Sequence, residues 1–304
     1  MLNFTYSRIK RLQQILYNIL FFAAIGKHPA VKKALQIDIT SKCNLRCQGC
    51  YHFSGPPVED LDDESMLAFL ETKARQGHKK LWIFGGEPTL RSNLFDQIDQ
   101  WFLEVHVISN GQIKIDPKFN WRIWVSLDGP EEVNDAIRGA GTFKKVLDNY
   151  TGDKRVGLVM TVNRQNYQYI PTMVELVKQI KVRSLSFTFY SPCRGDINTD
   201  FAFQAEDLPK IESIVTGQIQ KNSKYLMIDP ATLKSLLYGK IIHPCWDNRC
   251  YFAAVLTESY SSAGKLRKCC VENVTCETCR ILPPHQLHCL MVTRQAPWWQ
   301  YVRK

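Results

Sequence analysis

Three closely spaced cysteines constrain this chain more than any other feature. Cys43, Cys47 and Cys50 have the spacing C-x3-C-x2-C, within the run Ser-Lys-Cys-Asn-Leu-Arg-Cys-Gln-Gly-Cys-Tyr. The spacing places three thiolates on one loop, one fewer than the four that usually hold an iron–sulfur cube. A cube with three protein ligands keeps one iron open, and an open position distinguishes a reactive metal site from a structural one. A zinc site and a redox pair are the alternatives at this point, because C-x2-C is common in both.

The remaining cysteines gather toward the other end of the chain. The sequence has 11 cysteines in 304 residues; seven lie between Cys245 and Cys289, and Cys193 stands alone. Two groups of this kind favour metal ligation in a reducing cytoplasm over a disulfide framework. We interpret Cys193 as a buried small apolar residue.

The chain is basic, with a formal net charge of +10. Such a charge permits an anionic partner, such as nucleic acid or a membrane surface. The basic residues are spread along the sequence, however, and no run matches an RNA-binding module. Nucleic acid is therefore not expected as a partner.

Apolar segments alternate with helical patterns along the first two thirds of the chain. The predicted strands are 35–40, 80–84, 105–108, 122–127, 156–162 and 184–190. Apolar residues at helical spacing predict helices around 66–74 and 94–102, from about 142, through 174–177, and at 206–220 and 230–237. This alternation predicts parallel βαβ units and an α/β fold. Polar or glycine-rich residues follow the strands, at the ends where α/β barrels build their sites.

Residues 1–32 form a separate segment with helical periodicity. Its apolar stripe comprises Ile9, Leu12, Ile15, Leu16, Ile19, Leu20 and Ala23, and Ser7, Arg8, Arg11, Gln14 and Asn18 fill much of the other side. The apolar stretch 15–25 is too short to span a bilayer. Two interpretations remain: a helix that packs on the barrel, or a basic amphipathic helix of residues 1–25 on a membrane surface. We expect packing, the usual role of such a stripe.

Two further motifs lie at the ends of predicted strands. Gly85-Gly86-Glu87-Pro88 ends the second strand, while Ser126-Leu127-Asp128-Gly129-Pro130 and then Asn134-Asp135-Ala136-Ile137-Arg138-Gly139 follow the fourth. With the cysteine triplet, and in this order, they resemble the radical S-adenosylmethionine (SAM) superfamily over about residues 33–192. The resemblance implies a partial (β/α)6 TIM-type barrel at about 33–225.

The resemblance also implies the cofactors and their contacts. Cys43, Cys47 and Cys50 would hold a [4Fe–4S] cluster whose fourth iron binds SAM, and reduction would cleave SAM to a 5′-deoxyadenosyl radical. The residues expected to contact SAM are Tyr51, Gly85, Gly86, Glu87, Pro88, Asn110, Ser126 and Arg138. Glu87 would supply a countercharge to the methionyl ammonium, and the planar guanidinium of Arg138 suits the SAM carboxylate. For Asp128, an Asx turn before Gly129 is at least as well supported as a substrate role. No residue is assigned to the chemistry on the substrate.

The C-terminal cysteines resemble the start of an auxiliary-cluster domain of the kind called SPASM, or twitch when shortened. Cys250-x13-Gly264-x4-Cys269 is followed by Cys276-Glu-Thr-Cys279, and His285 stands where the next cysteine is expected. The resemblance implies a shortened domain at about 240–304 with a second [4Fe–4S] cluster on Cys250, Cys269, Cys276 and Cys279. Cys245, Cys270 and Cys289 are substitutes, and a zinc ribbon is the alternative.

The chain is thus expected to be a cytoplasmic radical SAM enzyme, with SAM and an electron donor such as flavodoxin or ferredoxin as partners. Contact with the inner membrane surface through residues 1–25 is the open alternative noted above. A small molecule or lipid is favoured as substrate, because roughly 30 residues before the barrel are too few for a leader-peptide-binding domain. A peptide maturase is the alternative within the superfamily. A non-catalytic iron–sulfur or zinc protein that binds nucleic acid is the alternative of another class.

Overall fold

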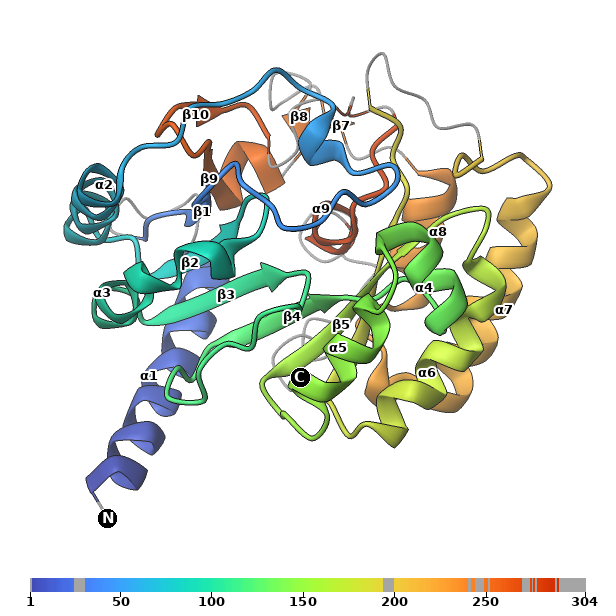
Figure 1. Ribbon diagram of the computed structural model, residues 1–304, viewed down its shortest axis with the longest axis horizontal. Coiled ribbons are helices and arrows are strands. Elements are labelled where there is room, and N and C mark those ends of the chain that lie inside the picture. Colours follow the sequence, from blue (N-terminus) through green and yellow to red (C-terminus); the bar gives the residue numbers. More distant parts are fainter. Residues whose placement is uncertain are drawn as a thin grey trace.

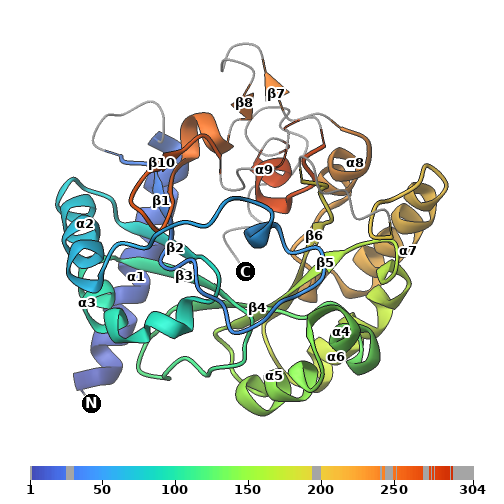
Figure 2. The same ribbon diagram turned by 45° about the horizontal axis from the view of Figure 1, so that its top comes forward.

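A curved sheet of eight strands organises the molecule, with strand order β10-β9-β1-β2-β3-β4-β5-β6. The structure, a computed structural model, describes residues 2–24, 31–193, 200–239, 242–243, 249–250, 252–269, 274, 276, 278–287 and 289. Figures 1 and 2 show the strands as an open wall, with helices α2, α3, α5 and α6 along its outer side. The fold is the predicted α/β partial barrel.

Six strands pair in parallel in the order of the chain. They are β1 (Ala34–Asp38), β2 (Lys80–Phe84), β3 (Glu104–Ser109), β4 (Arg122–Ser126), β5 (Val156–Val162) and β6 (Ser184–Phe189). All six predicted strands are confirmed. Because the strands are parallel, their carboxyl ends meet at one rim of the barrel and their amino ends at the other.

Helices connect the strands on the outside. They are α2 (Asp63–Arg75), α3 (Phe95–Trp101), α4 (Glu131–Arg138), α5 (Thr142–Tyr150), α6 (Ile170–Gln179), α7 (Asp207–Asn222) and α8 (Pro230–Tyr238), with short 3-10 helices at Tyr51–Phe53, Pro88–Leu94, Tyr167–Tyr169 and Ser223–Tyr225. α4 has no counterpart among the predicted helices, because its sequence EEVNDAIR contains few apolar residues. The predicted helix at 94–102 begins as a 3-10 turn before α3.

Side chains of the parallel strands divide between two faces, as the period of two requires. Leu35, Ile37, Leu81 and Ile83 belong to the main buried core, on the side that also includes helix residues such as Met66. Intervening residues line the inside of the barrel. There Trp82, His106 and Trp124 stack, with ring centroids 4.0 Å and 6.5 Å apart. The inner wall is therefore aromatic and polar, while the outer face forms the apolar core.

The cysteine-rich region is built into the same sheet. β9 (Thr257–Tyr260) pairs in parallel with β1, and β10 (Leu266–Arg267) pairs antiparallel with β9. At the opposite edge of the sheet, the Phe189 N–H donates to the carbonyl of Arg280 (2.9 Å). The short elements β7 (Ile242–His243), β8 (Arg249–Cys250), a π-helical turn at Phe252–Leu256 and α9 (Leu282–Leu287) complete this region. The C-terminal region thus contacts both edges of the partial barrel.

The N-terminal helix α1 (Leu2–Ala24) packs on the barrel, as expected, but through the opposite face. Gln14 Nε2 donates to the carbonyl of Leu103 (2.8 Å), and Asn18 Nδ2 donates to Glu104 Oε2 (2.7 Å). Phe21 is buried against Ala34 and Leu256. The expectation that the apolar stripe is the packed face is wrong, because the amino ends of β2 and β3 present polar and charged groups that require polar partners. No helix in the described part of the chain is long and apolar enough to cross a membrane.

Candidate active site

The cysteine loop leaves the carboxyl end of β1 and is tied down at its base. Asp60 Oδ2 accepts the Thr40 hydroxyl (2.6 Å), and Asp60 Oδ1 accepts the Ser41 N–H (2.7 Å). Burial alone would raise the pKa of Asp60, but these hydrogen bonds lower it below its ordinary value. His52, just past the last cysteine, bonds the Ser41 carbonyl through Nε2 (2.8 Å). The two ends of the loop are therefore held side by side.

The three loop thiols lie together and are suited to a cluster. Each is half-buried and free, and burial is the main cause that raises the pKa of each thiol. Cys47 interacts electrostatically with both Cys43 and Cys50. No three potential ligands among the described residues are grouped tightly enough for one metal ion. The three half-buried thiols nevertheless form one group on the cysteine loop.

Polar hydrogens point at these sulfurs, as is usual around metal-bound thiolates. The Leu45 N–H lies 3.4 Å from Cys43 Sγ, and Asn110 Nδ2 lies 3.9 Å from the same atom. Arg138 Nη1 lies 4.0 Å from Cys47 Sγ. Asn110 and Arg138, both expected at the SAM site, thus reach the cysteine loop from β3 and α4.

Gly85 and Gly86 allow the end of β2 to approach the cysteine loop closely. A Cβ at position 85 would lie 2.3 Å from the Thr40 carbonyl oxygen, and one at position 86 would lie 2.2 Å from that of Lys42. The backbones are bonded across this contact, Gly86 N–H to Thr40 O (2.9 Å) and Glu87 N–H to Lys42 O (2.8 Å). The two glycines therefore hold the residues just before Cys43 in position.

Glu87 is fully buried, and its carboxylate joins the turn after β2 to the end of β3. Oε1 accepts the Thr89 N–H (3.0 Å), the Thr89 hydroxyl (2.6 Å) and the Ser109 hydroxyl (2.8 Å), and Oε2 accepts the Asn110 N–H (2.7 Å). Burial raises the pKa of Glu87, although these bonds oppose the rise. The carboxylate expected to face an ammonium group is thus shared with four protein donors, and it also positions Asn110.

Asp128 is bound to Arg138 instead of forming an Asx turn. Its Oδ2 lies 2.8 Å from Arg138 Nε, and its Oδ1 accepts the Thr161 N–H from β5 (2.7 Å). The Asx-turn expectation is wrong, because the carboxylate reaches across to the neighbouring strand and to the end of α4. Burial would lower the pKa of Arg138, but Asp128 and Cys47 raise it. Asn134, which sequence reasoning did not assign, holds the turn by accepting the Asp128 N–H (3.1 Å).

The remaining residues expected at the SAM site lie around the same rim. Ser126 is the last residue of β4 and is partly exposed. Tyr51 directly follows Cys50 and is 37% exposed. Pro88 is buried at the start of the 3-10 helix after Glu87. The structure brings these side chains to the carboxyl rim, where such barrels place their sites.

A second group of thiols forms in the C-terminal region. Cys250 and Cys279 each interact electrostatically with Cys269 and Cys276. Burial is the main cause that raises the pKa of Cys250 to about 11 and that of Cys279 to about 12. These are the four residues expected to hold a second cluster. Cys289 and Cys193 are buried, as expected for Cys193, while Cys245 and Cys270 lie outside the described residues.

His285 is buried and supports this second group through the backbone. Its Nε2 lies 2.9 Å from the Cys279 carbonyl oxygen, and its Nδ1 lies 2.7 Å from Ser235 Oγ. Since a carbonyl only accepts, Nε2 is the protonated nitrogen and Nδ1 accepts from the serine. Both ring nitrogens are therefore engaged. His285, which stands where the sequence pattern expects a further cysteine, positions Cys279 through this hydrogen bond.

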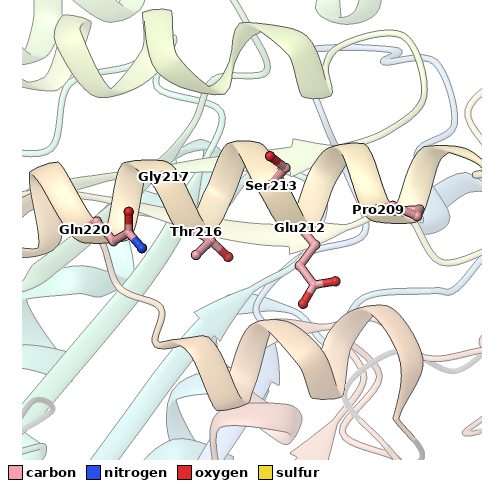
Figure 3. Close-up of a pocket in the computed structure, with 6 residues that line it drawn as sticks. All are labelled: Pro209, Glu212, Ser213, Thr216, Gly217 and Gln220. Carbon is pink, nitrogen blue, oxygen red and sulfur yellow. The ribbon is translucent and has the colours of Figure 1, made fainter.

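A shallow groove elsewhere on the surface lacks comparable chemistry. It has a volume of about 480 Å³ and runs along α7, lined by Pro209, Glu212, Ser213, Thr216, Gly217 and Gln220 (Figure 3). Its one carboxylate, Glu212, accepts a hydrogen bond from Tyr238 (3.0 Å). The cysteine loop at the barrel rim, not this groove, is the candidate site.

This chain combines an α/β partial barrel with a thiol loop after the first strand. In this combination it is similar to a known class of enzyme cores. Residues 37–177 match the family model of the Radical SAM superfamily. The chain is 31% identical over 186 residues to GTP 3′,8-cyclase of Sulfurimonas denitrificans, covering 54% of this chain and 57% of that protein. It is 30% identical over 169 residues to Fe-coproporphyrin III synthase of Methanosarcina barkeri, covering 49% and 42%. The chain spans about half the length of the curated relatives it matches.

A solved structure shares the fold. Streptococcus suis SuiB bound to S-adenosylmethionine superposes with a TM-score of 0.62 at 17% identity, covering 78% of this chain and 60% of SuiB. SuiB has also been solved bound to the precursor peptide SuiA. At this identity the likeness concerns the fold alone.

Proposed function

We propose that this chain is a radical SAM enzyme that cleaves S-adenosylmethionine reductively and modifies a further substrate. The observation that carries the proposal is the meeting of Cys43, Cys47 and Cys50 at the carboxyl rim, with N–H groups from Asn110 and Arg138 directed at their sulfurs. A [4Fe–4S] cluster on these thiols would supply the electron that breaks a carbon–sulfur bond of SAM and releases a 5′-deoxyadenosyl radical.

The protein's own residues would bind and orient SAM. Arg138, aimed by Asp128, would hold the carboxylate of SAM, with the Ser126 hydroxyl at the end of β4 as a further donor. Asn110, fixed by Glu87 through its backbone N–H, would contact the ribose. The Gly85–Gly86 segment would receive the methionyl ammonium beside Glu87, and the Tyr51 backbone would contact adenine. Glu87 and Asp128 are themselves buried, which strengthens the polar contacts that these two carboxylates make.

We also propose a second [4Fe–4S] cluster on Cys250, Cys269, Cys276 and Cys279, in a shortened SPASM-like region. Its support is the mutual electrostatic interaction of the four thiols and the position of His285 behind Cys279. A zinc site on the same thiols is the alternative. We place the enzyme in the reducing cytoplasm, where such clusters persist, with an acidic electron donor such as flavodoxin or ferredoxin, to which a net charge of +10 is complementary.

The substrate class is proposed as a small molecule or a lipid. Two relatives at 30–31% identity carry names of small-molecule enzymes, and these names support the class. A peptide substrate is the second candidate, supported by the 27% identity over 162 residues to the sporulation killing factor maturation protein SkfB of Bacillus subtilis.

The test is reconstitution of the chain with iron and sulfide, followed by dithionite and SAM, with 5′-deoxyadenosine quantified. The wild type should form this product, and the Cys43→Ala/Cys47→Ala/Cys50→Ala variant should form none. Product from the triple variant would refute the assignment, and metal binding without any SAM cleavage would favour a non-catalytic metalloprotein.

Metal analysis tests the second cluster. The wild type should hold about eight irons and the triple variant about four. Stoichiometric zinc in place of the second set of irons would favour the ribbon, and a wild type with about four irons would leave the C-terminal thiols without a cluster.

A further inference from the structure

An apolar stripe on α1 faces away from the barrel. Five of the eleven large apolar side chains that are exposed in the described residues lie on this one helix, at Leu12, Ile15, Leu16, Ile19 and Leu20, each between 42% and 62% exposed. Contiguous apolar surface of this kind marks an interaction site, whereas single exposed apolar residues do not.

The packed side of the same helix carries the polar residues Gln14 and Asn18 together with the buried Phe21. Gln14 and Asn18 bond Leu103 and Glu104 at the start of β3, and Lys80 Nζ donates to Asn18 Oδ1 (2.6 Å). A helix that only covers a core has the reverse arrangement, with its stripe inward. Since the barrel already satisfies the polar side, the stripe is left for a separate apolar partner.

Positive charge surrounds the rim on which α1 lies. Exposed basic residues stand at or within three residues before five of the six parallel strands: Lys32, Lys79, Arg122, Lys154 and Lys181. The amino ends of parallel strands share one rim, so these side chains form a basic ring there. Two acidic residues of this rim, Glu104 and Asp153, are ion-paired with Lys80 and Arg155. α1 itself contains Arg8, Lys10 and Arg11 and no acidic residue.

We propose that this rim docks on an anionic lipid bilayer, with the α1 stripe inserted among the acyl chains and the basic ring facing the headgroups. An apolar face next to cationic side chains is the pattern of helices that lie in a membrane interface. A second copy of the chain fits less well. Two such rims facing each other would bring like charges together.

Docking in this direction leaves the cysteine loop free. The loop lies at the carboxyl rim and α1 at the amino rim, on opposite ends of the barrel strands (Figure 1). The bilayer would therefore anchor the enzyme without covering the candidate site. The inference is independent of the substrate class and of SAM cleavage.

Vesicle flotation of the full-length protein tests the proposal. Mixed phosphatidylcholine–phosphatidylglycerol vesicles should carry the protein, and pure phosphatidylcholine vesicles should carry far less. Leu16→Asp/Leu20→Asp should weaken binding by at least ~100-fold, since two apolar side chains no longer leave water. Lys79→Gln/Lys154→Gln/Lys181→Gln should weaken it by about fivefold for each charge at low salt.

Leu266→Asp is the matched control, because Leu266 is 67% exposed on β10, and it should bind as the wild type does. Circular dichroism and thermal melting should show that all variants remain folded, since the altered side chains are exposed. Absence of binding to the mixed vesicles, or equal loss in the Leu266 control, would overturn the proposal. So would a wild-type dimer that Leu16→Asp/Leu20→Asp converts to monomer without any vesicle binding.

Discussion

Gly86→Ala should loosen the cysteine loop without touching a thiol. A Cβ at position 86 would lie 2.2 Å from the Lys42 carbonyl oxygen and 3.0 Å from the Cβ of Cys43. Both partners are on the segment that presents the first loop thiol, and the nearer one is backbone, which cannot swing aside as a side chain can. The loop and the end of β2 must therefore separate.

The size of the effect follows from these distances. Carbon–oxygen contacts are normally about 3.3–3.6 Å, so the segments must part by roughly 1 Å. That separation strains the bond from the Glu87 N–H to the Lys42 carbonyl, 2.8 Å in this structure, with a net contribution of about 1 kcal/mol. Overpacking adds about 1–3 kcal/mol. We expect the free energy of unfolding to fall by about 2–4 kcal/mol.

Two measurements check this prediction. Thermal unfolding should show a Tm lower by roughly 3–6 °C, and iron analysis after reconstitution should show a loss confined to the barrel cluster. Gly217→Ala on α7 is the matched control, because a Cβ built there meets nothing within 4 Å apart from its chain neighbours and the backbone of its own helix. The control should keep its iron and gain up to about 1 kcal/mol of stability from helix propensity. A Gly86→Ala protein with wild-type Tm and iron content would refute the idea that close backbone approach requires this glycine.

Three other changes follow from the contacts of the site and the inner wall. Asp128→Asn keeps an acceptor for Thr161 but removes the charge beside Arg138. It should lower the free energy of unfolding in urea by about 3 kcal/mol and weaken SAM binding measured by calorimetry. Unchanged values in both measurements would contradict the positioning role of Asp128. His285→Phe should lower only the C-terminal iron content, because it removes both bonds behind Cys279, and equal loss from both clusters would mean a general folding defect. Burial lowers the pKa of His106 from 6.5 to about 4. The neutral His106 ring therefore contributes fully to the free energy of unfolding above pH 6.5. This contribution declines as the pH falls toward 4, by up to about 1.4 kcal/mol per pH unit. His106→Phe should flatten this part of the stability profile, and an unchanged slope in denaturant titrations between pH 7 and 5 would show that another group is responsible.

Much of the site could be predicted from the sequence because its determinants are local. Each predicted strand is a short apolar run, and residues that directly follow parallel strands must gather at one rim. The position of Cys43, Gly86, Asn110 and Ser126 at that rim follows from this rule, and the structure confirms the six strands on which it depends. The grouping of the three cysteines could likewise be predicted, because residues so close in sequence need only a loop to bring them together.

Contacts between distant segments could not be predicted from the sequence. Asp128 looked like a turn residue, because nothing in its neighbourhood reveals that Thr161 lies on the adjacent strand. The pairing of β9 with β1 depends on which sheet edge is open, a property of the assembled barrel and not of either segment.

The N-terminal helix shows the same division. Its periodicity determined that one face is apolar, and that part of the prediction holds in α1. Which face is packed was decided by tertiary structure, because Lys80 and Glu104 at the barrel rim require hydrogen-bonding partners that only the polar side, through Asn18, provides. A sequence pattern separates the faces of a helix, but the surface that the helix meets decides which one is buried.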